Sequence, residues 1–143
     1  MAKRKPVSPE AAAKHEADVA LAGRFDDLFA RAQEAEQTLR AAQANGASLE
    51  DLHRAGKRLD SALTDVMRAA FAAQRAEIGP LGYDDRIYRR KAMATSPVRA
   101  WTMEAERLLT LRESHRLTGI VRLPRRSEAA PGTAGSAAST INA

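Results

Sequence analysis

The sequence predicts an all-α protein organised around a long antiparallel helical hairpin. Apolar residues recur at alternating spacings of four and three along residues 21–42 and again along residues 49–73, which is the pattern of a coiled-coil-like seam. Asn45 and Gly46 lie between these stretches and can end a helix in the left-handed conformation. Residues equally distant from this turn form matched pairs, among them Ala42 with Leu49, Leu39 with Leu52, Ala35 with Gly56, Ala32 with Leu59 and Leu28 with Leu63.

The first helix of the hairpin is predicted over residues 9–44. Ser8 can accept hydrogen bonds from the free amides of the first turn, and Pro9 suits the first helical position because no amide donor is needed there. A helix of this length spans about 54 Å at 1.5 Å per residue. We therefore expect one continuous helix up to the turn.

The second helix is predicted over residues 49–78. Ser48 and Asp51 resemble a capping box at its start, and Gly79 followed by a proline ends it. Gly56 in the helix interior costs about 1 kcal/mol relative to alanine. The pairing of Gly56 with Ala35 offers a compensation, because two small residues let the helices approach closely, and it predicts that Gly56→Leu splays or melts the hairpin.

A third helix is predicted over residues 97–118, after a second Ser-Pro start signal at Ser96. We expect it to dock over its first three turns at the open end of the hairpin, with Trp101 as its anchor, because Arg112 and His115 then interrupt its apolar stripe. It would cover apolar residues outside the seam, namely Val19, Ala22, Phe29, Met67, Phe71 and Ile78. The turn end would remain a two-helix projection carrying Leu39, Leu49 and Leu52.

The remaining segments are predicted to be arms and connectors. Asp84 can cap a short helix from Asp85 to Ala94. The end of the chain is rich in Ala, Gly, Ser and Thr, and such a composition buries too little apolar area to order itself. The predicted organisation is a basic N-terminal arm (1–7), a helical hairpin (8–79), a basic connector (80–96), a third helix (97–118) and an extended, flexible C-terminal tail (119–143).

Positive charge is concentrated outside the hairpin. The net charge is +5, residues 1–5 carry three basic side chains and no acidic one, and residues 80–126 carry eleven basic and five acidic side chains. Such an asymmetry is typical of a protein that contacts a polyanion or an acidic partner with its ends, and it is also common in small proteins without one.

The residues argue against most enzyme classes. The chain has no cysteine, and its three histidines, His15, His53 and His115, lie on three different predicted helices, where we expect them to be exposed and not to bind metal. A Gly-x-Ser-x-Gly turn and a glycine-rich phosphate loop are both lacking. We therefore expect no enzymatic activity, no cofactor and no metal.

No run of residues approaches the roughly 18 apolar positions that a membrane-spanning helix needs, and the positive N-terminus is not followed by the apolar segment of a secretory signal. We therefore expect no membrane association and a cytoplasmic location, or a place in a virion if a phage encodes the chain.

The connector carries the strongest candidate binding residues. Basic side chains there are interleaved with Tyr83 and Tyr88, so phosphates and stacked bases are possible ligands. The other interpretation is that the arginines pair with Asp84, Asp85 or the acidic hairpin and that the tyrosines fill the space under the third helix. The candidate polyanion-binding residues are Arg86, Arg89, Arg90 and Lys91, extended by Lys3, Arg4 and Lys5 at one terminus and Arg122, Arg125 and Arg126 near the other.

Two functional hypotheses follow from these features. The first is a non-enzymatic assembly protein that docks into a larger complex, as a homo-oligomer or with other subunits, through its hairpin and extended arms; a connector, core or tail accessory protein of a phage particle is one concrete form. Its candidate contact residues are Leu39, Leu49 and Leu52. The alternative is a nucleic-acid-binding accessory protein that contacts phosphates through its basic patches.

Overall fold

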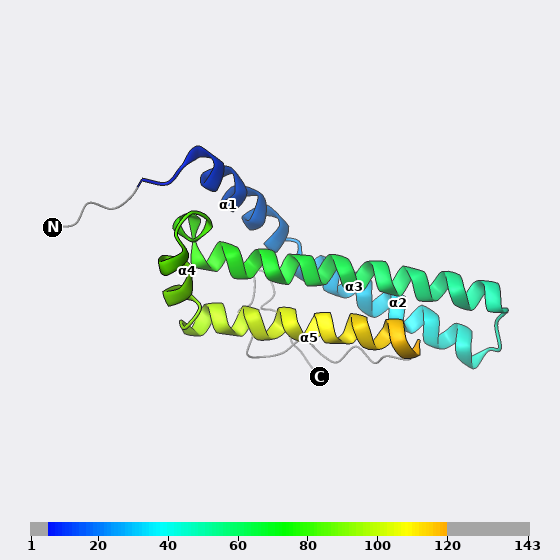
Figure 1. Ribbon diagram of the computed structural model, residues 1–143. Coiled ribbons are helices and arrows are strands. Elements are labelled where there is room, and N and C mark those ends of the chain that lie inside the picture. The colour runs from blue at the N-terminus through cyan, green and yellow to red at the C-terminus, as the bar shows by residue number, and fades with distance from the viewer. Residues whose placement is uncertain (1–5, 120–143) are drawn as a thin grey trace, which may run out of the picture.

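The computed structural model describes residues 6–119, and every regular element in this range is helical, which confirms the predicted all-α class (Figure 1). In chain order the elements are α1 (Pro9–Ala22), α2 (Phe25–Ala44), α3 (Leu49–Ile78), the short 3-10 helix η1 (Pro80–Tyr83), α4 (Arg86–Ala92) and α5 (Ser96–Thr118).

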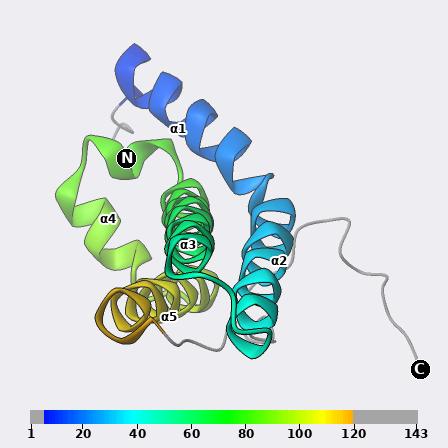
Figure 2. The ribbon, with the colours of Figure 1, turned by 90° about the vertical axis from the view of Figure 1, so that its right-hand side faces the viewer.

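Three long helices form the body of the protein. α2 and α3 run antiparallel on either side of the turn, and α5 runs back along α3, so that α3 contacts both of the others (Figures 1 and 2). α1 and α4 lie at the end of this body that is far from the hairpin turn (Figure 1). The turn end, which we call the tip, is therefore free of both short helices.

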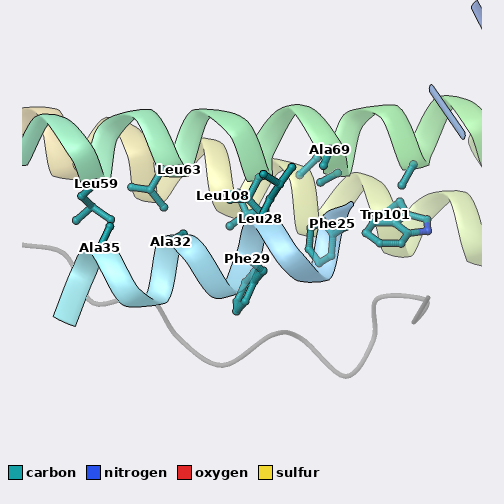
Figure 3. Close-up of a cluster of buried hydrophobic side chains, with 14 of the residues drawn as sticks. Phe25, Leu28, Phe29, Ala32, Ala35, Leu59, Leu63, Ala69, Trp101 and Leu108 are labelled. Atoms are coloured by element: carbon teal, nitrogen blue, oxygen red, sulfur yellow. The ribbon is translucent and has the colours of Figure 1, made fainter. Parts of the chain in front are cut away.

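The core lies between α2, α3 and α5. Leu59, Leu63 and Val66 of α3 are fully buried there, as the predicted seam required. Trp101 of α5 is 4% exposed and meets Phe25 of α2 in an edge-to-face contact with ring centroids 5.1 Å apart (Figure 3). Trp101 thus anchors α5 to the hairpin, and the apolar residues of all three helices form one cluster.

The prediction of one continuous helix over residues 9–44 is wrong. The helix breaks at Gly23 and Arg24, and α1 leaves the axis of α2 to cross α3 and η1 (Figures 1 and 2). Arg24 precedes α2 without any side-chain cap hydrogen bond. Glycine is a poor helix former, and the tertiary contacts of α1 favour the bend over the local propensity for a longer helix.

Polar contacts hold α1 on the body. Asp18 accepts two hydrogen bonds from Arg75 of α3, at 2.8 and 3.0 Å, and a third from the Tyr83 hydroxyl at 2.5 Å. The Ser8 hydroxyl donates to Asp84 at 2.6 Å. Ala11 is the one fully buried residue of α1, and Leu21 and Ala22 are partly buried against the core. The Asp18 cluster (Asp18, Arg75 and Tyr83) therefore holds α1 on the body together with these apolar contacts.

The helix ends follow the predicted capping except at the starts of α4 and α5; α5 begins at Ser96 itself, after Thr95, and has no side-chain cap hydrogen bond. The Ser48 hydroxyl accepts from the Asp51 amide at 3.1 Å at the start of α3, and Gly46 and Gly79 take positive φ values of 65° and 100° at the ends of α2 and α3. Asp84 does not cap α4. Asp85 does so, accepting from two amides at 3.0 Å each, since Asp84 is held by Ser8.

The acid stability of the fold is expected to depend on Asp18. Burial alone would raise its pKa, but the hydrogen bonds from Arg75 and Tyr83 outweigh burial and hold the pKa below its ordinary value. Because the pKa is lower in the folded state than in the unfolded state, this stabilisation is present at neutral pH and is lost as pH falls through the folded pKa. Asp18→Asn should therefore flatten the loss of stability below about pH 4, measured as the free energy of unfolding against pH.

Asp51→Asn, which removes an exposed carboxylate from the tip, is the control for the loss of one acidic group. The stabilisation from Tyr83 changes with pH in the opposite direction, because burial and the hydrogen bond to Asp18 raise the pKa of Tyr83. Its contribution persists below about pH 10 and is lost as pH rises through the raised value. If the free energy of unfolding falls equally steeply with acid in Asp18→Asn and in the parent chain, Asp18 is not the residue that sets the acid stability.

Candidate functional site

A surface groove opens between the tip and the end of α5, with a volume of about 1230 Å³. We call it the tip groove. Its lining includes apolar side chains from both arms of the hairpin and charged side chains from α3 and α5, among them Leu39, Leu49, Leu52, Lys57, Asp60 and Arg116. The groove therefore contains all three leucines that the sequence predicted as contact residues.

The structure divides these leucines by exposure. Leu49 is 86% exposed, Leu52 is half-buried, and Leu39 is buried, which corrects the expectation that all three project from the body. The reason is that α5 reaches further than its first three turns: Gly119 at its end accepts a hydrogen bond from Gln43 of α2 at 3.4 Å. Only Leu49 and part of Leu52 remain available to a partner.

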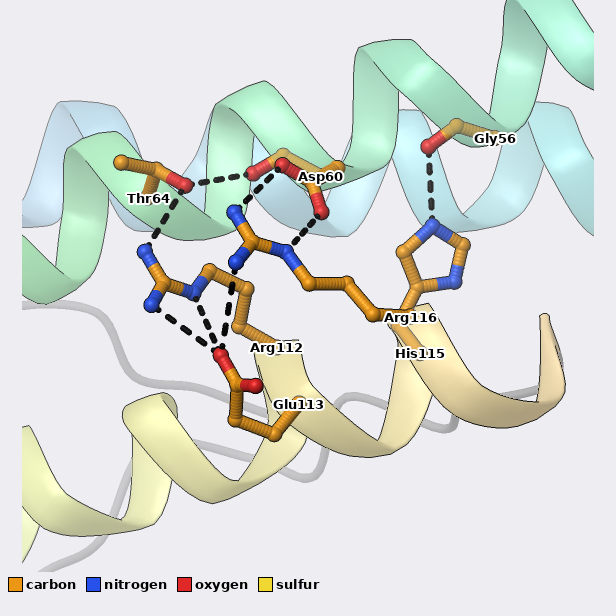
Figure 4. Close-up of polar contacts among 7 residues, drawn as sticks. All are labelled: Gly56, Asp60, Thr64, Arg112, Glu113, His115 and Arg116. Carbon is orange, nitrogen blue, oxygen red and sulfur yellow. Dashed lines mark hydrogen bonds and ion pairs between the residues drawn. The ribbon is translucent and has the colours of Figure 1, made fainter.

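A row of polar contacts joins α3 and α5 beside the groove, and Asp60, Thr64 and Arg116 of this row form its inner wall (Figure 4). Arg116 makes two hydrogen bonds to Asp60, at 2.7 and 3.2 Å, and Arg112 donates to Thr64 at 3.4 Å. Glu113 lies within 3.5 Å of both arginines. The hydrogen bonds from Arg116 lower the pKa of Asp60 despite its partial burial, so Asp60 is a stable anion facing a fixed guanidinium.

His115 is the residue whose position differs most from the prediction. It was expected to be exposed, but it is 7% exposed and its Nε2 lies 2.8 Å from the carbonyl oxygen of Gly56 (Figure 4). Its Nδ1 is buried and has no hydrogen-bond partner in the described part of the chain. The sequence predicts that α5 stops contacting the hairpin where Arg112 and His115 interrupt its apolar stripe. In the structure, His115 continues the contact between α5 and α3.

Gly56 consequently faces α5 and not the first arm of the hairpin. The atom nearest to a methyl group built at this position belongs to His115, at 3.9 Å, and no atom of Ala35 lies within 4 Å of it. A large side chain would displace the His115 ring here, whereas a methyl group would meet it at an ordinary contact distance. The predicted compensation of Gly56 by Ala35 is therefore wrong.

Gly56→Ala is expected to raise the free energy of unfolding by up to about 1 kcal/mol, because a contact of 3.9 Å is an ordinary one and alanine favours the helix. Gly56→Leu should lower it, because the longer side chain displaces His115. Thermal unfolding followed by circular dichroism compares the two variants. A destabilised alanine variant, or a leucine variant with an unchanged midpoint, would contradict this packing.

The predicted basic connector becomes a cationic surface on α4, at the end of the body opposite to the tip (Figure 1). Arg86, Arg90 and Lys91 are exposed, and none of them forms an ion pair with another described residue. Arg89 instead donates to the Gly82 carbonyl at 2.8 Å. We call Arg86, Arg90 and Lys91 the α4 basic surface.

The two tyrosines of the connector have separate environments. Tyr83 is bound to Asp18 and serves the attachment of α1, whereas Tyr88 is 41% exposed beside the α4 basic surface. Ile87 next to it is 69% exposed. Tyr83 is thus held by α1 and does not fill the space under the third helix, whereas Tyr88 is placed where it can contact a ligand.

The other predicted basic residues lie outside the described range, namely Lys3, Arg4, Lys5, Arg122, Arg125 and Arg126. Within residues 6–119, no three His, Asp or Glu side chains come together as a potential metal site. None of the helices in the same range has both the length and the apolar character needed to cross a membrane.

Sequence reasoning missed Asp60 and Arg116 as parts of the groove wall. A detectable signal exists, since Gly56, Asp60 and Thr64 follow each other at intervals of four and so form a polar stripe on one face of α3. Arg112 and Arg116 have the same interval on α5. Where the two helices pack, the arginines of the α5 stripe can donate hydrogen bonds to Asp60 and Thr64 of the α3 stripe.

No protein-family model, no curated protein and no solved structure matches this chain. Its function is therefore inferred from the contacts, burial and charges of its own residues.

Proposed function

We propose that the protein is a non-enzymatic assembly subunit that docks into a larger complex through the tip groove, with a virion component of a phage as one concrete form. The observation that carries this proposal is the exposure of Leu49, at 86%, on the edge of a groove of about 1230 Å³. Isolated surface leucines are common, but this one adjoins the half-buried Leu52 and forms part of a continuous concavity.

The composition of the groove supports a protein partner. Leucines and charged residues such as Lys57 and Arg116 line it together, and such a mixture of apolar and polar side chains is common in protein interfaces. A groove between two helices and the end of a third also suits an amphipathic helix from another subunit. A homo-oligomer or a mixed complex would satisfy these features.

Light scattering of the purified chain with a matched pair of variants tests the proposal. Leu49 and Leu117 are almost equally exposed, at 86% and 85%, but only Leu49 lines the tip groove. We expect the parent chain to form an oligomer as concentration rises, Leu49→Lys to shift it to the monomer, and Leu117→Lys to leave it unchanged. A monomer at every concentration, or equal effects of the two substitutions, would argue against docking at the tip.

The α4 basic surface supports a second candidate, a nucleic-acid-binding accessory protein. Arg86, Arg90 and Lys91 present three cations on one short helix, and Tyr88 beside them offers a ring for stacking. Binding through several phosphates should weaken steeply between about 50 and 200 mM salt.

Mobility-shift assays with single-stranded and duplex DNA test this candidate. Replacing the three cations with glutamine should abolish binding, while Arg58→Gln on α3 serves as the control for an exposed arginine elsewhere. Absence of binding at about 50 mM salt would remove the nucleic-acid hypothesis and would leave the assembly proposal unaffected, since the two surfaces lie at opposite ends of the body.

A further inference from the structure

The attachment of α1 differs in kind from that of the other long helices. α2 and α5 contribute a series of buried apolar residues to the core, whereas α1 buries only Ala11 completely. Its polar contacts with the body are the Asp18 cluster, the Ser8–Asp84 hydrogen bond and a contact of 3.3 Å between His15 and the Ala76 carbonyl. Leu21 and Ala22, next to the junction with α2, add partly buried apolar contacts with the core. A helix with one fully buried residue belongs to the part of a protein that opens first.

The junction between α1 and α2 is nearly helical. Gly23 has φ −64° and ψ −16°, and Arg24 has φ −93° and ψ 2°. The Gly23 amide still bonds to the Val19 carbonyl at 3.0 Å, and the Leu28 amide to the Arg24 carbonyl at 2.9 Å. Changes of a few tens of degrees at these two residues would therefore join α1 and α2 into one helix.

Straightening the junction would separate α1 from the surface that it covers. Residues 9–44 would then form a rod of about 54 Å, and the Asp18 carboxylate would leave Arg75 and Tyr83. The uncovered face of α3 would include Ala72, which is buried and lies one turn before Ala76 on the same side of the helix. Such an open form needs a replacement for α1.

We propose that α1 is an exchangeable arm, and that two copies of the chain swap their α1 helices by straightening at Gly23 and Arg24. A second copy is the partner that fits, because the uncovered face carries the Arg75 and Tyr83 groups that bind Asp18 and the Asp84 carboxylate that binds Ser8. The polar contacts of Ser8 and Asp18 would then form between chains and not within one chain. The exchange is independent of the tip groove.

Interchain distances between spin labels test the exchange in the full chain. The chain has no cysteine, so Ala12→Cys places one label on α1 and Glu77→Cys places one on α3, both at exposed positions. Equal amounts of the two singly labelled chains are mixed at high concentration. In swapped dimers, α1 of one copy lies on α3 of the other, so a short α1–α3 distance appears between chains.

An insertion variant distinguishes exchange of α1 from other ways in which two chains could associate. Four Gly/Ser residues inserted after Gly23 allow α1 to fold back on its own chain and prevent a straight helix, so the short interchain distance should disappear. The same insertion after Gly46, in the hairpin turn, is the control and should retain it. Leu49→Lys should retain it as well, which distinguishes the exchange from docking at the tip.

A short interchain distance that is lost only on insertion after Gly23 would establish the swap. The proposal is overturned if the mixed chains show no interchain distance at concentrations up to about 1 mM, or if the distance survives the insertion after Gly23. Either of these results would leave the tip-groove proposal standing.

Discussion

Replacing Trp101 with alanine is expected to lower the free energy of unfolding by about 3–5 kcal/mol. The indole is 4% exposed and meets Phe25 edge to face, so its removal leaves a cavity between α5 and α2 and breaks an aromatic contact. Because α5 also carries the inner wall of the tip groove, the groove should lose its shape in the same variant.

Denaturant unfolding followed by circular dichroism measures this effect. Met103→Ala is the control, because Met103 lies on the same helix and is 63% exposed. A Trp101→Ala variant no less stable than Met103→Ala would contradict the role of Trp101 as the anchor of α5.

Arg107→Leu is expected to cost a similar amount, about 3–5 kcal/mol, because it leaves the Glu104 carboxylate without its partner. The Glu104 side chain is fully buried and pairs with Arg107, one turn further along α5. One oxygen of Glu104 already has no hydrogen-bond partner in the described part of the chain. The single substitution would thus leave an uncompensated charge inside the protein.

The double variant Glu104→Met with Arg107→Leu separates the cost of an unpaired charge from the cost of altered packing. We expect it to recover the stability of the parent chain or to exceed it, because apolar replacements of buried ion pairs are often neutral or stabilising. If the single and double variants lose the same free energy of unfolding, the loss comes from altered packing around Arg107 and not from an unpaired charge. A double-mutant cycle in denaturant provides the measurement.

The sequence predicted the helical class and much of the core because these depend on local periodicity. The alternation of apolar residues identified Leu59, Leu63 and Val66 as seam positions, and all three are buried. The apolar stripe after Ser96 identified Trp101 in the same way. Such patterns are set by helix geometry alone and need no knowledge of tertiary contacts.

The break in the first helix could not be predicted in this way. Gly23 is a weak signal by itself, since glycine occurs inside helices, as Gly56 does in α3. The bend is decided by the bonds of Asp18 to Arg75 and Tyr83, which are distant in sequence. Tertiary contacts of this kind add to the cost of about 1 kcal/mol that glycine carries in a helix interior, and together they favour the break.

The candidate site was predicted in part. Its leucines followed from the seam, but the extent of α5 did not, because Arg112 and His115 interrupt the apolar stripe on which the prediction of docking rests. In the structure, His115 and Arg116 extend the contact through polar bonds to Gly56 and Asp60. The interval of four marks a polar stripe on each helix, but the sequence does not show that the two stripes face each other, so their complementarity becomes visible only when the helices are placed side by side.

Hydrogen–deuterium exchange of the full chain at low and high concentration tests docking at the tip most directly. We predict that association slows exchange in residues 49–57 of α3 and at the end of α5, and that Leu49→Lys abolishes this protection while Leu117→Lys retains it. Identical exchange at both concentrations, or protection confined to residues outside the tip groove, would contradict the proposal that the tip groove is the assembly surface.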